Sequence, residues 1–237
     1  PMLKKSNVDG TLHCLDLAAT HPVKDLHYIS TASVYDSGFY RAIDGVKETP
    51  IAAEGSDLYG GYAQSKWVAE RLVEQANDYG LKTYIYRPNG IGPSLNVNRS
   101  RFHESDAFSL LLQASISMGV VYDLPMNVDF LPVDYIASAI VQLSLKPLKH
   151  RIFSMTNPMS KKIATLLPMF NALGCSLSIV AYEEWVKQLQ AYAHKIKYQP
   201  LISLLPLLKQ SISGENESWL DIASSRPLLS SEHFQQE

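Results

Sequence analysis

The chain has 237 residues, 46% of them hydrophobic and 19% charged, and its 21 basic residues nearly balance its 23 acidic ones. This composition excludes a disordered chain, and the charge balance excludes the basic surface of a nucleic-acid-binding or membrane-surface protein. The two cysteines exclude a disulfide framework and a cysteine-rich zinc site, and they favour a reducing, cytoplasmic setting.

In the first half of the chain, hydrophobic spacing predicts helices that alternate with short apolar strands. The predicted elements are a helix at 8–19, a strand at 26–30, a polar loop at 36–58, a helix at 60–79 and a strand at 83–86. Cys14 falls inside the first helical pattern and is expected to be buried. On the second helix, Val68 and Val73 are expected to face the core. Glu70 and Glu74 are expected to face solvent. This order of elements predicts βαβ units and a parallel sheet.

The second half of the chain shows a looser pattern. The predicted elements are a loop at 93–106, a helix at 107–118, a strand at 128–133, a helix at 135–145, a strand at 151–155 and helices at 161–173 and 183–194. Asp134 is the candidate N-cap of the helix at 135–145. The apolar run from Leu201 is broken by Pro206, is too short to span a bilayer and is interpreted as a pair of helices. The tail after Gly214 has few apolar residues and is expected to fray.

Residues suited to catalysis gather in three segments. These are STASVYD at 30–36, GGYAQSKWVAERL at 60–72 and YRPNGIG at 86–92. Tyr62 and Lys66 are four residues apart on one predicted helix, so they share a face. Thr31 follows one predicted strand, and the Arg87–Pro88 turn follows the next. Because ligands bind beyond the carboxyl ends of parallel strands, the three segments are expected to converge on one crevice.

These side chains suit hydride delivery to a carbonyl group. A phenol ionises only near pH ~10 and is a poor proton donor or acceptor at neutral pH, but a cation one helical turn away favours the phenolate. A hydroxyl such as that of Thr31 can hold the substrate carbonyl oxygen while the phenol of Tyr62 protonates it. In a purely structural interpretation, Ser30, Thr31 and Ser33 would only cap the following turn. The seven histidines show no HxxxH or HxH spacing, so no metal site is expected.

At these residues the chain resembles the extended branch of the short-chain dehydrogenase/reductase superfamily. YAQSK at 62–66 matches the family's YxxxK motif, STASVY resembles the strand end that carries its Ser or Thr, and NVDGT at 7–11 resembles its NVxGT segment. The longer matches GGYAQSKWVAERLV, YRPNGIG and LPVDYIASAIVQLS resemble thioester reductase domains of non-ribosomal peptide and polyketide synthases and of carboxylic acid reductases. Trp67 and YEEW at 182–185 fit these domains better than sugar-nucleotide epimerases.

The resemblance implies an α/β fold, in which the C-terminal part of a Rossmann-like parallel sheet is joined to a smaller, mostly helical substrate subdomain. The sheet is expected from 1–92 and 132–155, and the substrate subdomain from 93–131 and 156–237. The implied catalytic residues are Thr31, Tyr62, Lys66 and Asn7. The implied cofactor-binding residues are Tyr62, Lys66, Pro88, Asn89 and Ile91. As an alternative to catalysis, Asn7 is also a candidate helix N-cap.

The activity implied by the resemblance is NADPH-dependent reductive release of an acyl or peptidyl thioester to an aldehyde, or to an alcohol after a second reduction. The implied partner is the phosphopantetheine-bearing carrier protein of the same synthase. Two alternatives stay open. One is another extended-branch enzyme that acts on a sugar nucleotide or a small carbonyl compound. The other is a fragment that packs or binds without turnover.

One expected part of the family pattern is absent from the sequence. The family opens with a strand and a glycine-rich turn that holds the cofactor pyrophosphate. Among the twelve glycines only Gly90 and Gly92 begin such a pattern, and Leu95 occupies the third glycine position. The chain is therefore expected to be a piece of a longer protein that is inactive alone and binds NADPH weakly. With an unpaired strand edge and an uncovered apolar face, it is also expected either to self-associate or to rearrange its own segments over the exposed sheet.

Overall fold

The computed structural model describes residues 3–96, 106–123, 127–209 and 219–237. The chain divides into two compact units. The sheet unit consists of Pro1–Ile91, Phe130–Pro158 and Ser225–Glu237, and the helical unit consists of Gly92–Asp129 and Met159–Ser224. Within the described residues, no helix combines the length and the apolar character needed to cross a bilayer.

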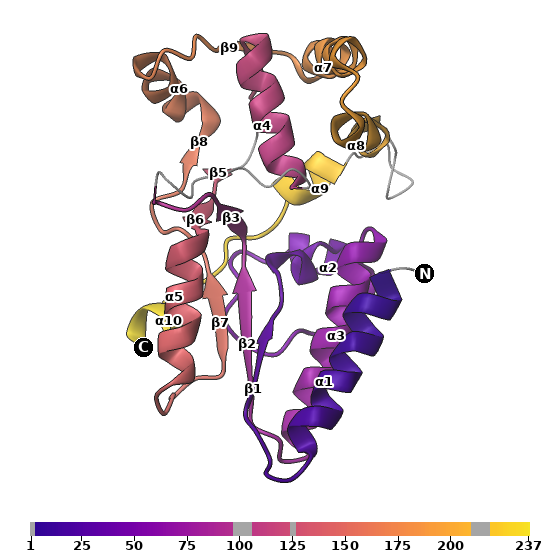
Figure 1. Cartoon of the computed structure of the whole chain (residues 1–237), viewed down its shortest axis with the longest axis vertical. Coiled ribbons are helices and arrows are strands. Elements are labelled where there is room, and N and C mark those ends of the chain that lie inside the picture. The colour runs from indigo at the N-terminus through magenta and orange to yellow at the C-terminus, as the bar shows by residue number, and fades with distance from the viewer. Residues whose placement is uncertain (1–2, 97–105, 124–126, 210–218) are drawn as a thin grey trace. The chain divides into compact units, whose positions relative to one another are not determined.

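The sheet unit is built on three parallel strands in the order β1-β2-β7 (Figure 1). Their bounds are Leu26–Ile29 for β1, Thr83–Pro88 for β2 and Ile152–Met155 for β7. In the register, Ile29 pairs with Tyr86, and Tyr86 pairs with Phe153. Thus the prediction of parallel strands joined through helices is confirmed. β1 is an edge strand of this sheet: among the described residues, its hydrogen-bonded neighbour strand is β2.

Helices cover both faces of this sheet (Figure 1). On one face lie the π-helical turn η1 (Lys4–Asp9) and the helices α1 (Gly10–Ala19) and α3 (Gly61–Asp78), which pack on one another. On the other lie α5 (Val133–Ser144) and α10 (Glu232–Gln236). Successive strand residues point to opposite faces. Accordingly, Ile85 packs in the cluster of α1 and α3, whereas Tyr86 packs against α5.

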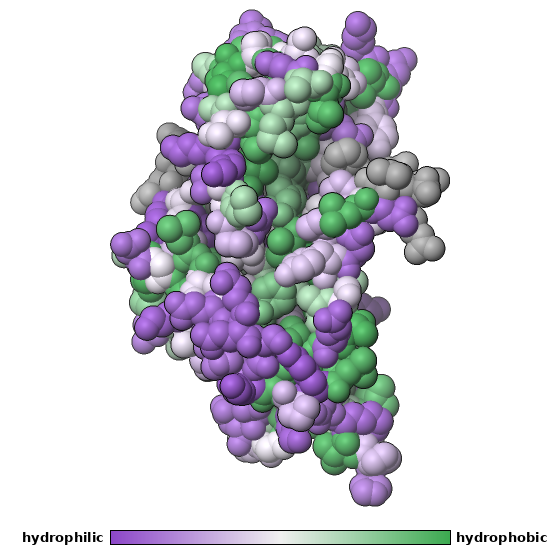
Figure 2. Space-filling model, turned by 90° about the vertical axis from the view of Figure 1, so that its left-hand side faces the viewer, coloured by the Kyte–Doolittle hydropathy of each residue, from purple (hydrophilic) through white to green (hydrophobic). Residues whose placement is uncertain are grey.

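The outer side of α5 keeps apolar side chains at the surface. Val133, Val141 and Leu145 are exposed. Figure 2 presents the side of the molecule that carries α5 and α10, and hydrophobic side chains there stand among hydrophilic ones. Exposed apolar residues that are scattered in this way are usual on protein surfaces.

The polar loop predicted at 36–58 contains short helices instead. η2 (Ala32–Tyr35) precedes it, and α2 (Gly38–Arg41) and η3 (Ala53–Ser56) lie within it. Ser37 caps α2 by accepting a hydrogen bond from Tyr40 N. The Tyr40 hydroxyl in turn accepts one from Ala52 N at 2.6 Å. Such isolated polar contacts leave no periodic signal in the sequence, so the prediction missed these turns.

Two predictions about individual helices of the sheet unit were wrong. Cys14 is exposed rather than buried, because α1 buries Thr11, Leu15 and Ala18, and Cys14 lies just outside this stripe. Asp134 is not the N-cap of α5 but lies in its first turn, and the capping position belongs to Pro132.

The expected outward orientation of Glu70 and Glu74 was also wrong. Both side chains are buried, and Val68, which was expected in the core, is 41% exposed. The reason is Arg87, which is fully buried at the end of β2. Its Nε and Nη2 atoms lie 3.0 Å and 2.5 Å from Glu70 Oε1, and Nη2 lies 3.8 Å from Glu74 Oε1. A buried arginine therefore turns the acidic side of α3 toward the sheet.

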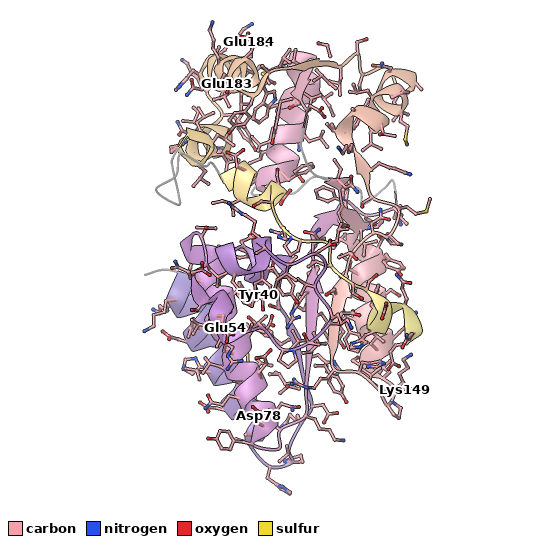
Figure 3. The ribbon with its side chains drawn as sticks, turned by 180° about the vertical axis from the view of Figure 1, so that it is seen from behind. Tyr40, Glu54, Asp78, Lys149, Glu183 and Glu184 are labelled. Carbon is pink, nitrogen blue, oxygen red and sulfur yellow. The ribbon has the colours of Figure 1, made fainter. Side chains whose placement is uncertain are left out.

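In the helical unit, helices pack around the large side chains of α4 and α7. α4 (Ala107–Met118) has the predicted bounds, begins with Asp106 accepting from Ser109 N and ends at the left-handed Gly119. It packs on α7 (Tyr182–Ile196) and α8 (Gln199–Lys209), and the unit also contains α6 (Ile163–Ala172) and α9 (Trp219–Ser224). The core of this unit centres on Trp185 of α7 and Leu111 of α4. Glu183 and Glu184 point outward from the first turn of α7 (Figure 3).

Short strands accompany these helices. In the helical unit, β4 (Val120–Tyr122) pairs in parallel with β9 (Ser178–Val180), and β5 (Asn127–Val128) pairs antiparallel with β8 (Lys161–Lys162). A further pair joins β3 (Gly90–Gly92) and β6 (Phe130–Pro132). Thus the strand predicted at 128–133 is divided between two pairs. α8 is one helix that contains Pro206, not the predicted pair of helices.

The tail also differs from the prediction. Residues Ser225–Glu237 belong to the sheet unit, whereas the sequence assigned them to the substrate subdomain and expected fraying. Val46 N donates to Leu228 O and Ser230 N donates to Val46 O, each at 2.8 Å, and His233 N donates to Glu48 Oε2 at 2.6 Å. Hydrogen bonds fasten this segment, so its shortage of apolar residues was misleading. Residues 210–218 of the predicted tail lie outside the described residues.

Candidate active site

Thr31 stands directly beyond the carboxyl end of β1. Its backbone is extended, and it forms the N-cap of η2, with Oγ1 accepting a hydrogen bond from Ser33 N at 3.2 Å. The alternative of a capping hydroxyl therefore describes this contact correctly. It does not exclude chemistry, because a hydroxyl that accepts one hydrogen bond keeps its own O–H for donation. Ser30 N donates to Tyr86 O at 2.7 Å and fixes this strand end to β2.

Tyr62 and Lys66 lie in the first two turns of α3. Tyr62 is 49% exposed. Lys66 Nζ donates to Ile29 O at 2.7 Å and lies 4.4 Å from the centroid of the Tyr28 ring. Burial lowers the pKa of Lys66 to about 8, although the Glu70 carboxylate acts to raise it. Lys66 thus connects α3 to the carboxyl end of β1, two residues before Thr31.

Asn7 reaches the same part of α3 through a relay of hydrogen bonds. It lies inside η1, whose N-cap is Leu3, so the N-cap alternative for Asn7 was wrong. Asn7 Nδ2 donates to Ser65 Oγ, and Ser65 Oγ donates to the carbonyl oxygen of Tyr62, both at 2.9 Å. Asn7 therefore fixes the turn that carries Tyr62. Ser65 was not singled out from the sequence, because a serine inside a helix gives no functional signal.

Pro88, Asn89 and Ile91 follow β2 at the same edge of the sheet. Pro88 is buried, Asn89 is half-buried and Ile91 is 43% exposed. Asn89 N donates to Met155 O at 3.2 Å, which fixes the turn to β7. Since β1 and β2 are parallel and in register, this turn and Thr31 both lie at the carboxyl edge.

The structure therefore places the predicted residues on elements that pack together. Both η1 and η2 contact α3; η1 carries Asn7, Thr31 caps η2, and α3 carries the Tyr62–Lys66 pair. In the part of the chain that the structure describes, Thr31, Tyr62 and Lys66 form no hydrogen bond with one another, and the backbone of β1 and η2 links them. Asp78 and Lys149 mark the opposite, amino end of the sheet (Figure 3).

Arg226 is a contributor that the sequence did not reveal. Its Nε and Nη2 atoms contact the two carboxylate oxygens of Asp36 at 2.8 Å and 2.9 Å. Nη1 donates to Asn89 Oδ1 at 2.6 Å, and Nη2 donates to Ser33 Oγ at 3.3 Å. Arg226 is 190 residues from Asp36 in the chain. A single arginine in a polar segment belongs to no recognisable sequence motif, so these contacts could not be predicted from the sequence.

A parallel sheet whose carboxyl edge carries Thr31 beside a helix with Tyr62 and Lys66 has the architecture of extended short-chain dehydrogenases/reductases. The model of the NAD-binding family described as male sterility protein matches residues 1–140. The chain belongs to this family.

The chain is similar to parts of large curated synthases and reductases. The chain is 31% identical to the nonribosomal peptide synthetase asaC of Aspergillus flavus over 228 residues. This match covers 91% of this chain and 22% of the relative. It is 30% identical to a linear gramicidin synthase of Brevibacillus parabrevis over 79% of this chain and 4% of the relative. It is 29% identical to L-2-aminoadipate reductase of Saccharomyces cerevisiae over 91% of this chain and 16% of the relative.

Solved structures show the same likeness. The terminal R domain from the myxalamid PKS-NRPS biosynthetic pathway superposes with a TM-score of 0.79 at 31% identity, over 98% of this chain and 56% of that one. A thiolation-reductase di-domain from an archaeal non-ribosomal peptide synthetase gives a TM-score of 0.67 at 25% identity, over 92% and 47%. The chain thus spans about half the length of these solved chains.

Proposed function

We propose that this chain supplies the catalytic residues of a reductase that releases a carrier-protein-bound acyl or peptidyl thioester as an aldehyde, with NADPH as the hydride donor. The observation that carries the proposal is the attachment of Lys66 to Ile29 O, because it places the Tyr62–Lys66 helix beside the strand end that presents Thr31. The similarity to synthase reductase domains supports the choice of substrate. Residues 1–92 and 132–155 would serve the cofactor, and the helical unit would serve the substrate.

The residues present fit the nicotinamide half of a dinucleotide. A lysine ammonium has three donors, and Ile29 O uses one of those of Lys66. The other two can bind the ribose hydroxyls. Pro88, Asn89 and Ile91 supply a partly apolar wall at the same edge. The sequence contains no glycine-rich turn that would hold the pyrophosphate.

The mechanism assigns one task to each side chain. When bound, NADPH supplies the hydride that attacks the thioester carbonyl carbon. The hydroxyls of Thr31 and Tyr62 donate to the oxygen on which negative charge develops, and Tyr62 delivers the proton to it. Asn7, through Ser65, holds the turn that carries Tyr62. The resulting hemithioacetal breaks its C–S bond to give the aldehyde and the free phosphopantetheine thiol.

A substrate comparison tests this proposal in the complete reductase that contains the chain. Initial rates of NADPH oxidation are measured with an acyl group on its carrier protein, with the same acyl group on a small thiol, and with a sugar nucleotide and a small ketone. The proposal expects the carrier-bound thioester to be reduced with the highest kcat/KM, and expects an aldehyde as the product. A preference for the sugar nucleotide or the ketone would overturn it, and so would equal rates with the small thiol ester.

Lys66→Ala is expected to weaken both turnover and cofactor binding. The dissociation constant for NADPH should rise about 10- to 100-fold, since a hydrogen bond from a charged group contributes about 1.5–3 kcal/mol. Because the pKa of Lys66 is about 8, kcat/KM should also fall as the pH rises through that value in the wild type but not in the variant. Lys82→Ala, which changes an exposed lysine next to β2, is the matched control. Unchanged cofactor affinity in Lys66→Ala would refute the ribose contact.

The 237-residue chain by itself is expected to bind NADPH only in the millimolar range. Most of the anchoring of a dinucleotide comes from the pyrophosphate and the adenosine half. Reduced nicotinamide mononucleotide should therefore bind about as weakly as NADPH. Calorimetric titration with both compounds makes the comparison. A micromolar dissociation constant for NADPH would show that the cofactor site has been misplaced.

A further inference from the structure

Arg226 joins three chain segments that are far apart in the sequence. It comes from the C-terminal segment Ser225–Glu237 and contacts Ser33 and Asp36 after β1 and Asn89 after β2. We call Arg226, Ser33, Asp36 and Asn89 the arginine clamp. Both turns that the clamp joins carry residues of the candidate site, because Thr31 precedes one and Pro88 the other.

The clamp is a buried, geometrically defined interaction. The side chains of Arg226 and Asp36 are 12% and 6% exposed. Two guanidinium nitrogens contact two carboxylate oxygens, a fork-to-fork arrangement that fixes orientation as well as distance. The remaining Nη1 donor reaches Asn89 Oδ1 at 2.6 Å. Arg226 therefore bridges the turn after β1 and the turn after β2, beyond the last backbone hydrogen bonds between the two strands.

A short path leads from the clamp to the Thr31 hydroxyl. Arg226 Nη2 donates to Ser33 Oγ, and Ser33 N donates to Thr31 Oγ1. The guanidinium thus restrains the residue whose N–H orients the catalytic hydroxyl. We propose that Arg226 is a positioning residue of the active site. It fixes the position of the Thr31 hydroxyl relative to the turn at Asn89. This inference rests on the proposed function, and Arg226 itself need not touch substrate or cofactor.

Other contacts hold the C-terminal segment independently of Arg226. Leu228 and Ser230 bond to the backbone of Val46, and His233 N bonds to Glu48, which also accepts from Ser154 N at 2.7 Å. Loss of the guanidinium should therefore loosen the two turns without releasing the segment. This makes positioning separable from simple anchoring of the tail.

The test compares Arg226→Ala and Arg226→Lys in the complete reductase, with Arg71→Ala as the matched control. Arg71 also pairs with a carboxylate, that of Glu74, but contacts no residue of the candidate site. Arg226→Ala is expected to lower kcat about 10- to 100-fold with KM within about threefold, since a misplacement of ~1 Å can cost about 10²-fold. Arg226→Lys should fold as Arg226→Ala does and recover little of the lost kcat, because one ammonium cannot bridge Asp36 and Asn89. Guanidinium ion at a non-denaturing concentration should raise kcat of Arg226→Ala only.

A kcat for folded Arg226→Ala equal to that of Arg71→Ala would overturn the inference, and so would a loss that guanidinium ion does not reverse. If the wild-type reductase does not reduce the carrier-bound thioester, the proposed function fails. Hydrogen exchange on the 237-residue chain then tests whether Arg226 positions the two turns, independently of the reaction. Amides of 31–36 and 89 should exchange faster in Arg226→Ala, while those of β2 and β7 keep their protection. Unchanged exchange at 31–36 and 89 would refute it.

Discussion

Tyr62→Phe in the complete reductase is expected to lower kcat by about 10²–10⁴-fold, the usual contribution of a general acid. The substitution removes the O–H group and keeps the ring. Tyr62 is 49% exposed and its ring remains in place, so neither cofactor affinity nor the melting temperature should change measurably. Single-turnover rates, NADPH titration and thermal unfolding measure the three quantities.

Tyr79→Phe is the matched control for this experiment. Tyr79 lies at the other end of α3 and is 83% exposed. It should retain the wild-type rate. A wild-type kcat in Tyr62→Phe would remove Tyr62 from the mechanism, whereas equal losses in both variants would indicate a general defect of α3.

Arg87→Met is expected to destabilise the sheet unit by about 3–5 kcal/mol, because it leaves an uncompensated carboxylate in the interior. Arg87 and Glu70 are both fully buried, and Arg87 also donates to Tyr35 OH and, at 2.9 Å, to Thr49 O. Hydrogen exchange at the β2 amides measures this loss, since it reports the opening of the sheet unit by itself.

The double variant Arg87→Met/Glu70→Leu separates charge burial from packing. Replacing both members of a buried ion pair by apolar residues is often neutral or stabilising. The double variant should therefore be more stable than Arg87→Met alone. Arg71→Met breaks a pair in which Arg71 is 44% exposed, and it should cost less than Arg87→Met, because the buried Glu74 keeps its hydrogen bond from Ile51 N and its contact with Arg87. A double variant as unstable as Arg87→Met would show that the Met side chain, not the unpaired charge, causes the loss.

The parts of the fold that could be predicted are those with a strong apolar period. α4 has the predicted bounds, and α3 differs from its prediction by one residue at each end. The strands β1, β2 and β7 were also found, because short apolar runs between helices indicate a buried parallel sheet. In these elements the hydrophobic pattern and the tertiary contacts agree.

Polar contacts between distant residues could not be predicted. Glu70 resembles a surface residue until Arg87, 17 residues later, is known to be buried beside it. The C-terminal segment resembles a loose tail until its hydrogen bonds to Val46 and Glu48 are seen. Neither kind of contact has a period or a fixed spacing that a sequence can display.

The residues of the candidate site also fall into those that could be predicted from the sequence and those that could not. Resemblance to a family named Thr31, Tyr62, Lys66 and Asn7, and the structure places them on packed elements at one edge of the sheet unit. Their catalytic roles stay predictions until the variants are measured. Ser65 and Arg226, which connect or restrain them, were found only through the structure.

The sheet unit is assembled from three stretches of chain that alternate with two stretches of the helical unit. During synthesis from the N-terminus, β7 therefore reaches its place beside β2 only after 92–129 have emerged from the ribosome, and Arg226 follows only after 159–224. Such non-local pairing is slow to form and leaves incomplete sheets exposed meanwhile. The helical unit needs only its own two stretches. Because Arg226 lies only two residues beyond the end of that second stretch, the turn that carries Thr31 gains its arginine only when the helical unit is completed, so the candidate catalytic edge would be among the last parts of these 237 residues to take shape.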